Sequence, residues 1–220
     1  MRSKSTSLPL PLSAARSCSQ EIAPGAVLLH GFALQWEKVV VAAVDDISAH
    51  SPFRHMLTPS GHRMSVAMTN CGSYGWITDR SGYRYSEFDP LTGGPWPSMP
   101  PEFSMLANNA TSRAGFTNFS PDACLINRYE PGARMALHQD KDERDINAPI
   151  VSVSLGLPII FLFGGMTRKD KPMRIPLEHG DVVVWGGPAR LRYHGVMPLK
   201  DGEHPAFGNA RINLTLRKAR

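Results

Sequence analysis

The sequence predicts a mainly β protein with flanking helices, of the α+β class, whose strands form a double-sheet jelly roll or a barrel. After residue 120 the chain is a series of short runs rich in β-branched and aromatic residues, separated by Gly, Pro and Asp. Helical periodicity occurs before that point. The β core therefore lies in the C-terminal half, and the mouth of such a core is a common place for a ligand site.

The length and composition indicate a single compact domain. A chain of 220 residues with 42% hydrophobic content is long enough to bury a sizeable core. We expect residues 1–22 to be a flexible tail, because the first 20 residues contain no acidic residue and are rich in Ser, Pro and Arg. Residues 23–220 then form the single domain.

Two helices are expected ahead of the β core. In residues 34–50 the apolar positions recur at helical spacing: Trp36, Val39, Val40, Ala43 and Val44. In residues 100–115 a pair of prolines is placed to open a second helix. Between them, residues 64–101 are rich in aromatic residues and interrupted by Gly and Pro, which predicts short strands joined by long turns.

Six strands are expected in the core, at residues 123–130, 150–156, 159–165, 181–187, 190–196 and 211–217. The last of them, "RINLTLR", alternates strictly: one face is apolar and the other carries Arg211, Asn213, Thr215 and Arg217. Six residues at ~3.3 Å separate its two arginines by about 20 Å at the backbone, so long side chains leaning inward can span a small dicarboxylate. The run "NRY" supplies further donors at Asn127 and Tyr129.

A candidate metal site begins in "LHQDKDE". His138 and Asp140 are two residues apart, so on an extended backbone they share a face and supply half of a two-histidine, one-carboxylate iron site. The remaining ligand comes from His179, His194 or His204. We favour His194, inside the β run 190–196, because "HGD" (His179 to Asp181) is typical of a turn that Asp181 caps while His179 faces solvent. A polar turn is the alternative for an isolated His-x-Asp.

Charge and cysteine content bound the partners and the compartment. The net charge of +5 and the pI near 9.3 favour polyanionic partners, although an ordinary basic surface explains them equally well. Three cysteines are too few for a disulfide framework, which predicts a reducing compartment, the cytoplasm. No apolar stretch reaches the roughly 18 residues of a membrane span, so we expect a soluble protein without a membrane partner.

Six stretches together resemble the AlkB family of iron- and 2-oxoglutarate-dependent nucleic-acid demethylases, over residues 25–217: "MSVAMTNCG", "PDACLINRY", "LHQDKDE", "APIVSVSLGLP", "LEHGDVVVWGG" and "NLTLR". The resemblance implies a double-stranded β-helix, or jelly roll, at about 120–218 with an N-terminal nucleotide-recognition lid at about 53–98. It implies Fe(II) ligation by His138, Asp140 and His194. It further implies that 2-oxoglutarate is held by Asn127, Tyr129, Arg211, Asn213 and Arg217.

The resemblance also implies a substrate site and a reaction. The residues expected to contact the damaged base are Trp76, Tyr83, Tyr85, Asp142 and Arg168. A monomer would use Fe(II), O2 and 2-oxoglutarate to demethylate bases of the 1-methyladenine and 3-methylcytosine type in single- or double-stranded DNA and also in RNA, with release of succinate, CO2 and formaldehyde. Arg192 stands where the family pattern has an aromatic residue. A small-molecule 2-oxoglutarate oxygenase and a non-catalytic nucleic-acid-binding module of the same fold are the alternatives.

Overall fold

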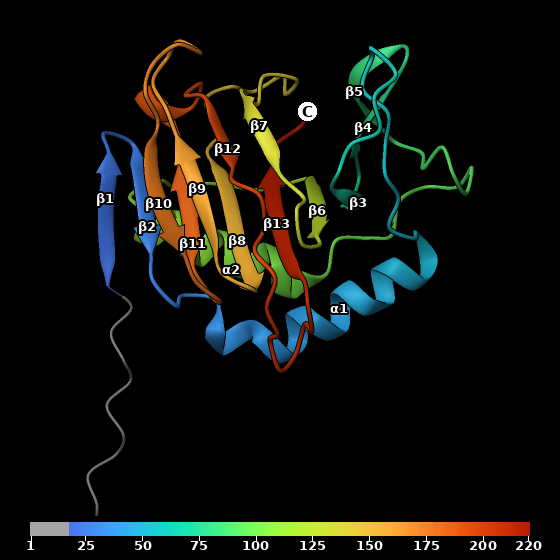
Figure 1. Cartoon of the computed structure of the whole chain (residues 1–220), viewed down its shortest axis with the longest axis horizontal. Coiled ribbons are helices and arrows are strands. Elements are labelled where there is room, and N and C mark those ends of the chain that lie inside the picture. Colours follow the sequence, from blue (N-terminus) through green and yellow to red (C-terminus); the bar gives the residue numbers. More distant parts are fainter. Residues whose placement is uncertain (1–17) are drawn as a thin grey trace, which may run out of the picture.

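The structure, a computed structural model, describes residues 18–220 and contains two antiparallel sheets packed face to face (Figure 1). The seven-stranded sheet has the order β1 (Ser19–Ala23), β2 (Ala26–Leu29), β11 (Val182–Trp185), β8 (Ile150–Gly156), β13 (Arg211–Arg217), β6 (Ala123–Tyr129) and β3 (Ala67–Gly72). The four-stranded sheet has the order β10 (Met173–Leu177), β9 (Ile159–Phe163), β12 (His194–Val196) and β7 (Met135–His138). The expected mainly β jelly-roll architecture is confirmed.

Two helices cover the outer face of the larger sheet, as Figure 1 shows, and both lie where the sequence predicts them. A 3-10 turn, η1 (Leu34–Trp36), leads into α1 (Glu37–His50), and α2 is Pro101–Arg113. Pro101 opens α2 at no cost, because the amide of the first helical residue would have no partner within the helix. Neither helix, nor any other in residues 18–220, is long and apolar enough to cross a membrane.

The alternating pattern of the strands decides what each face of the larger sheet presents. The apolar face of β13 packs against the apolar side chains of α1 and α2. Its residues are Ile212, Leu214 and Leu216. The opposite face of the sheet packs against the four-stranded sheet, where Trp185 of β11 contacts the cluster around Phe161. The polar residues of β13 therefore face the space between the two sheets, which is where a binding site can form.

The predicted boundary of the N-terminal tail at residue 22 is wrong, because β1 begins at Ser19. This strand pairs with β2 through the "PG" turn, where Gly25 has φ +79°. A Cβ atom at Gly25 would lie 2.5 Å from the carbonyl oxygen of Gly186, so only glycine fits. The remainder of the predicted tail, residues 1–17, lies outside the described residues.

The region expected to contain short strands holds β3 and a separate hairpin, β4 (Gly75–Asp79) and β5 (Gly82–Ser86). Figure 1 shows the hairpin standing beside the β3 edge of the larger sheet. Four strands, β1, β2, β7 and β10, were not predicted, and the predicted strand 190–196 is shorter. Its first part follows the 3-10 turn η2 (Gly187–Ala189), and only His194–Val196 pairs as β12.

Candidate active site

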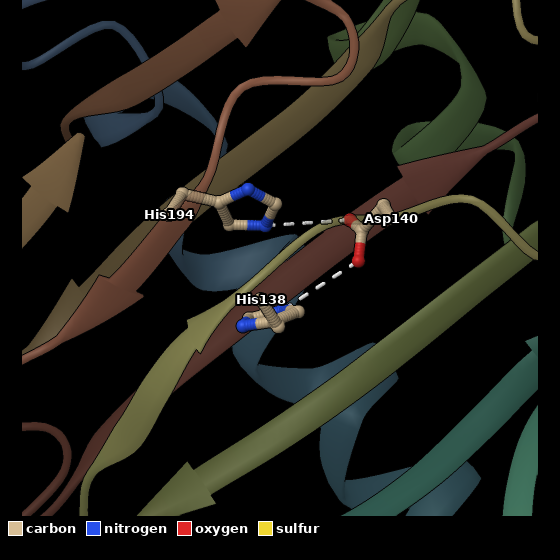
Figure 2. Close-up of side chains that lie close together, drawn as sticks. All are labelled: His138, Asp140 and His194. Carbon is tan, nitrogen blue, oxygen red and sulfur yellow. Dashed lines mark ion pairs between the residues drawn. The ribbon is translucent and has the colours of Figure 1, made fainter. Parts of the chain in front are cut away.

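Three potential ligands meet at one end of the smaller sheet. His138 is the last residue of β7, Asp140 follows it by two residues, and His194 opens β12, which pairs with β7 so that the two histidines are Cα partners. One ligand atom from each residue lies within 4.8 Å of the other two. Figure 2 shows both imidazole rings directed at the Asp140 carboxylate. The register of β7 and β12 thus brings together the three residues that the sequence analysis proposed as iron ligands.

Backbone carbonyl groups fix the orientation of both imidazoles. His138 Nδ1 donates to the Ala136 carbonyl oxygen at 2.9 Å, and His194 Nδ1 donates to the Arg192 carbonyl oxygen at 3.1 Å. A carbonyl oxygen only accepts, so the proton of each neutral ring is on Nδ1 and each Nε2 presents a lone pair. Both Nε2 atoms lie 3.6 Å from a carboxylate oxygen of Asp140 (Figure 2). Three acceptor atoms therefore face one another, which is an arrangement that a cation stabilises.

The protonation states suit this arrangement. Burial lowers the pKa of His194, and the neighbouring His138 lowers it further, so the ring stays neutral near neutral pH. Burial by itself raises the pKa of Asp140, but the Arg217 guanidinium outweighs burial and holds that pKa well below its ordinary value. Arg217 Nη2 donates to Asp140 Oδ2 at 2.6 Å. His194 and Asp140 are thus in the protonation states that bind a metal.

A cavity of about 60 Å³ between the two sheets adjoins two of the three candidate ligands, His138 and His194. Its walls include Asn127, Tyr129, Ser152, Arg211, Asn213, Thr215 and Arg217, together with His138 and His194. All five residues predicted to hold 2-oxoglutarate line it. Arg211 is 1% exposed, and its Nη1 has no hydrogen-bond partner within residues 18–220. A buried guanidinium with a free donor favours an anionic ligand, since leaving that donor unpaired is costly.

A network of neutral polar side chains fixes the floor of the cavity. Asn213 Nδ2 donates to Ser152 Oγ at 2.9 Å, and Asn127 Nδ2 donates to Asn213 Oδ1 at 3.2 Å. Arg211 Nε donates to Ser154 Oγ at 2.9 Å, and its guanidinium lies over the Tyr129 ring. These bonds connect β6, β13 and β8, so the seven-stranded sheet forms a well-fixed wall of the cavity.

Aromatic residues of the β4–β5 hairpin lie near this site. The rings of Trp76 and Tyr83 are stacked, with centroids 5.6 Å apart. Trp76 Nε1 donates to Asp142 Oδ2 at 2.9 Å, and Asn70 holds the Trp76 backbone through two further hydrogen bonds. Asp142 is only two residues beyond Asp140. The hairpin is therefore anchored directly to the segment that carries the candidate ligands.

Known proteins resemble this chain in sequence and in fold. The family model of the 2OG-Fe(II) oxygenase superfamily matches residues 25–217. "Alpha-ketoglutarate-dependent dioxygenase AlkB" of Escherichia coli strain K12 is 57% identical over 91% of this chain and 93% of its own length. The chain belongs to the AlkB family. The AlkB homolog of Caulobacter vibrioides is 45% identical over 84% of this chain and 82% of its own length. The solved structure of OsALKBH1 superposes with a TM-score of 0.81 at 30% identity, covering 91% of this chain and all of that one.

The residues present fit Fe(II) and 2-oxoglutarate, the metal and the cosubstrate of the 2OG-Fe(II) oxygenase superfamily. Two neutral imidazoles and one carboxylate are the ligand set of non-haem Fe(II) oxygenases, and here their acceptor atoms converge. The unpartnered Arg211 nitrogen and the Arg217 guanidinium are cationic groups that would suit the two carboxylates of 2-oxoglutarate. His138, Asp140 and His194 would hold the metal, and the five cavity residues would hold the cosubstrate.

One of the expected AlkB-type base contacts has a different environment. Tyr85 is 8% exposed, and its hydroxyl donates to Glu143 Oε1 at 2.6 Å instead of facing a ligand surface. Glu143 also accepts from Arg190 Nη2 at 3.0 Å and lies 3.5 Å from Arg217 Nε. Tyr85 thus joins the hairpin to the buried charges behind Asp140. The sequence analysis missed Glu143 and Arg190, since nothing in the charged run 140–144 marks one acid as buried.

The structure differs in part from the expectations for Arg168 and for the "HGD" turn. Arg168 lies exposed on the loop between β9 and β10, and within residues 18–220 no hydrogen bond or ion pair joins it to the other predicted base-contacting residues. Asp181 caps its turn as predicted, accepting from the Glu178 amide at 2.9 Å. His179 does not face solvent as expected: its Nδ1 accepts from the Gly156 amide at 3.0 Å, and its Nε2 lies 3.3 Å from Glu37. The second His-x-Asp is therefore structural.

Proposed function

We propose that this chain oxidatively removes N-methyl groups from alkylated bases of the 1-methyladenine and 3-methylcytosine type, in DNA and also in RNA. The observation that carries the proposal is the cluster of the His138, Asp140 and His194 ligand atoms beside an arginine-lined cavity, with the Trp76–Tyr83 stack bonded to Asp142 in the same segment. The relatives named as AlkB are dioxygenases dependent on alpha-ketoglutarate, and OsALKBH1 has the same fold. Fold, donor set and family point to one chemistry.

The chain's own residues position the reactants. Arg211 and Arg217 orient the carboxylates of 2-oxoglutarate, while the imidazoles and Asp140 hold Fe(II). When bound, Fe(II), 2-oxoglutarate and O2 supply the oxidation that hydroxylates an N-methyl group, after which the product loses formaldehyde and the cosubstrate leaves as succinate and CO2. An extruded base needs an aromatic surface to replace its lost stacking, worth about 1–3 kcal/mol per base, and the Trp76–Tyr83 pair offers one. In this role residues 53–98 act as a recognition lid.

Formaldehyde release tests the proposal directly. The wild-type protein, supplied with Fe(II), 2-oxoglutarate and air, is incubated with oligonucleotides that carry 1-methyladenine or 3-methylcytosine and with unmethylated controls. We expect formaldehyde and succinate in equal amounts from the methylated strands alone, in both DNA and RNA. Succinate formation that no methylated strand stimulates would favour a small-molecule oxygenase. Binding without turnover would favour a non-catalytic module.

Asp142 is expected to select damaged bases by charge. 1-Methyladenine and 3-methylcytosine are cationic near neutral pH, whereas their parent bases are neutral. At an effective dielectric constant near 20, charges ~4 Å apart attract by on the order of 4 kcal/mol before desolvation is subtracted. Asp142→Asn deletes the charge but keeps an oxygen that accepts from Trp76 Nε1. We expect kcat/KM to fall several-fold more for 1-methyladenine than for neutral 1-methylguanine; equal losses for both lesions would contradict charge selection.

We also propose that the protein works as a monomer in the cytoplasm. Cys71 and Cys124 are partners in the β3–β6 register, both are buried, and both are free thiols. A reducing compartment keeps such thiols reduced. Each residue assigned to iron or 2-oxoglutarate comes from one chain, so the proposed site needs no second copy.

A further inference from the structure

The loop between β9 and β10, residues 164–172, concentrates positive charge beside the candidate active site. It carries three exposed cations, Arg168, Lys169 and Lys171, and one acid, Asp170. The loop starts directly after Phe163, which is the Cα partner of His194 in the β9–β12 pairing. β12 is antiparallel to both β9 and β7, so the ends of β9 and β7 point the same way. The start of this basic loop at Gly164, called its root below, is therefore close to two candidate iron ligands, His194 and His138.

Arg192 holds this root. Its Nε donates to the Gly164 carbonyl oxygen at 2.7 Å, and its guanidinium carbon lies 5.2 Å from the centre of the Phe163 ring. Two backbone hydrogen bonds reinforce the contact: the Gly164 amide donates to the Tyr193 carbonyl oxygen at 2.7 Å, and the Tyr193 amide donates to the Gly165 carbonyl oxygen at 2.9 Å. A bonded and stacked planar guanidinium leaves the start of the loop little freedom.

The loop is also closed from within. Asp170 accepts from the Thr167 amide at 2.9 Å and from the Thr167 hydroxyl at 2.8 Å. These bonds and, more weakly, the charge of Arg192 hold the pKa of Asp170 below its ordinary value, so it stays an anion. A Cβ atom at Gly165 would lie 2.0 Å from Asp170 Oδ2, which explains the glycine. The loop therefore has hydrogen bonds of its own in addition to the contact of its first residue, Gly164, with Arg192.

The backbone of Arg192 reaches the other way. Its carbonyl oxygen accepts from His194 Nδ1 at 3.1 Å, so the residue that grips the loop also orients a candidate iron ligand. We propose that Arg192 is a positioning residue that fixes the basic loop 164–172 beside the iron ligands, so that Arg168 and its neighbouring lysines meet the phosphates that flank the extruded base. This inference rests on the proposed function. Its chemistry is that of cation contacts to a polyanion, which set register but read no sequence.

Coupling between Arg192 and the loop distinguishes positioning from a purely structural role. KM and kcat for a methylated oligonucleotide are measured for Arg192→Ala in the wild-type background and in a variant whose loop cations Arg168, Lys169 and Lys171 are all alanine. If Arg192 acts through the loop, KM should rise about tenfold in the first background and about twofold or less in the second, with kcat nearly unchanged. Equal increases in both backgrounds, or no increase in either, would overturn the proposal.

Two controls protect this comparison. Lys38→Ala removes one exposed cation from α1, on the far side of the larger sheet, and should leave KM unchanged. Arg192→Lys keeps the charge and one donor for Gly164 but loses the planar fork over Phe163, so it should give an intermediate KM. This variant keeps the test decisive if Arg192→Ala folds poorly. A KM for Arg192→Lys equal to that of the wild type would show that the planar contact with Phe163 contributes nothing and would contradict that part of the positioning.

Limited trypsin digestion examines the loop without any substrate. Cleavage after Arg168 and Lys169 should be at least about threefold faster in Arg192→Ala, because local opening of the loop becomes easier. Cleavage at the wild-type rate would refute the gripping contact. Since this measurement needs no turnover, it separates the two ideas: a wild-type protein that releases no formaldehyde overturns the proposed function, whereas an unchanged digestion rate overturns the role of Arg192.

Discussion

Replacing His138 with alanine should abolish demethylation while the protein stays folded. The substitution removes one of three convergent ligand atoms, and losing even an outer partner of a metal ligand costs about 10- to 100-fold, so a ligand should cost more. His138 is 39% exposed and belongs to a four-residue strand at a sheet edge. Its truncation leaves no large core cavity, so we expect the free energy of unfolding to change by less than about 1 kcal/mol.

His179→Ala is the matched control, because His179 belongs to the competing His-x-Asp. It should keep Fe(II) and activity but lower Tm, since the Gly156 amide loses its acceptor and a buried unpaired donor costs about 1–3 kcal/mol. Formaldehyde release, metal content and thermal unfolding of the two variants are compared. Iron retained by His138→Ala and lost by His179→Ala would reverse the assignment.

Replacing Arg217 with alanine should mainly impair 2-oxoglutarate use. Arg217 is 5% exposed and is bonded to Asp140 at 2.6 Å, with Glu143 at 3.5 Å. Removing it takes away a cationic fork for the cosubstrate and leaves two buried carboxylates with less compensation. We expect the apparent KM for 2-oxoglutarate to rise by about 30-fold to about 4,000-fold, equivalent to a loss of about 2 to 5 kcal/mol. The measurement is succinate formation against 2-oxoglutarate concentration at saturating oligonucleotide.

Two variants bracket the Arg217 result. Arg217→Lys should rescue poorly, since an ammonium group cannot serve Asp140 and a carboxylate ligand with a planar pair of donors. Arg128→Ala removes an exposed arginine of β6, which pairs with β13, and should leave the cosubstrate requirement unchanged. A 2-oxoglutarate dependence in Arg217→Ala like that of the wild type would exclude Arg217 from the cosubstrate site.

The sequence predicted the helices and most of the core because those segments have strong local periodicity. "RINLTLR" shows the principle: its alternation predicted which four side chains share a face, and all four line the cavity. β1 was missed because it is an edge strand whose first three residues are exposed, so no apolar pattern marks it and only its pairing with β2 defines it. β10 was missed because it is an edge strand with three of five residues exposed, so no apolar pattern marks it.

Within the site, the limit of sequence-based prediction was burial. Residue type, spacing and strand pattern pointed to His138, Asp140 and His194 and to the polar face of "RINLTLR", and the family resemblance implied the full iron and 2-oxoglutarate sets. The different fates of Asp142 and Glu143 depend on which elements pack around them: Trp76 meets the first, and Tyr85 and Arg190 enclose the second. A run of charged residues looks uniformly exposed until that packing is known. The reach of the Arg192 side chain to Gly164, across 28 positions of sequence, is equally invisible to local patterns.

The central place of β13 also determines when, during synthesis of the chain, the proposed site can be completed. β13 lies between β8 and β6, yet it is made after every other strand described here, and it carries both arginines of the cavity. A nascent chain that ends before Arg211 holds all three candidate iron ligands but leaves two strand edges unpaired and lacks the anchors for the cosubstrate. If the proposed function holds, we expect such an incomplete chain to lack activity, because the cavity is formed only when β13 joins β8 to β6.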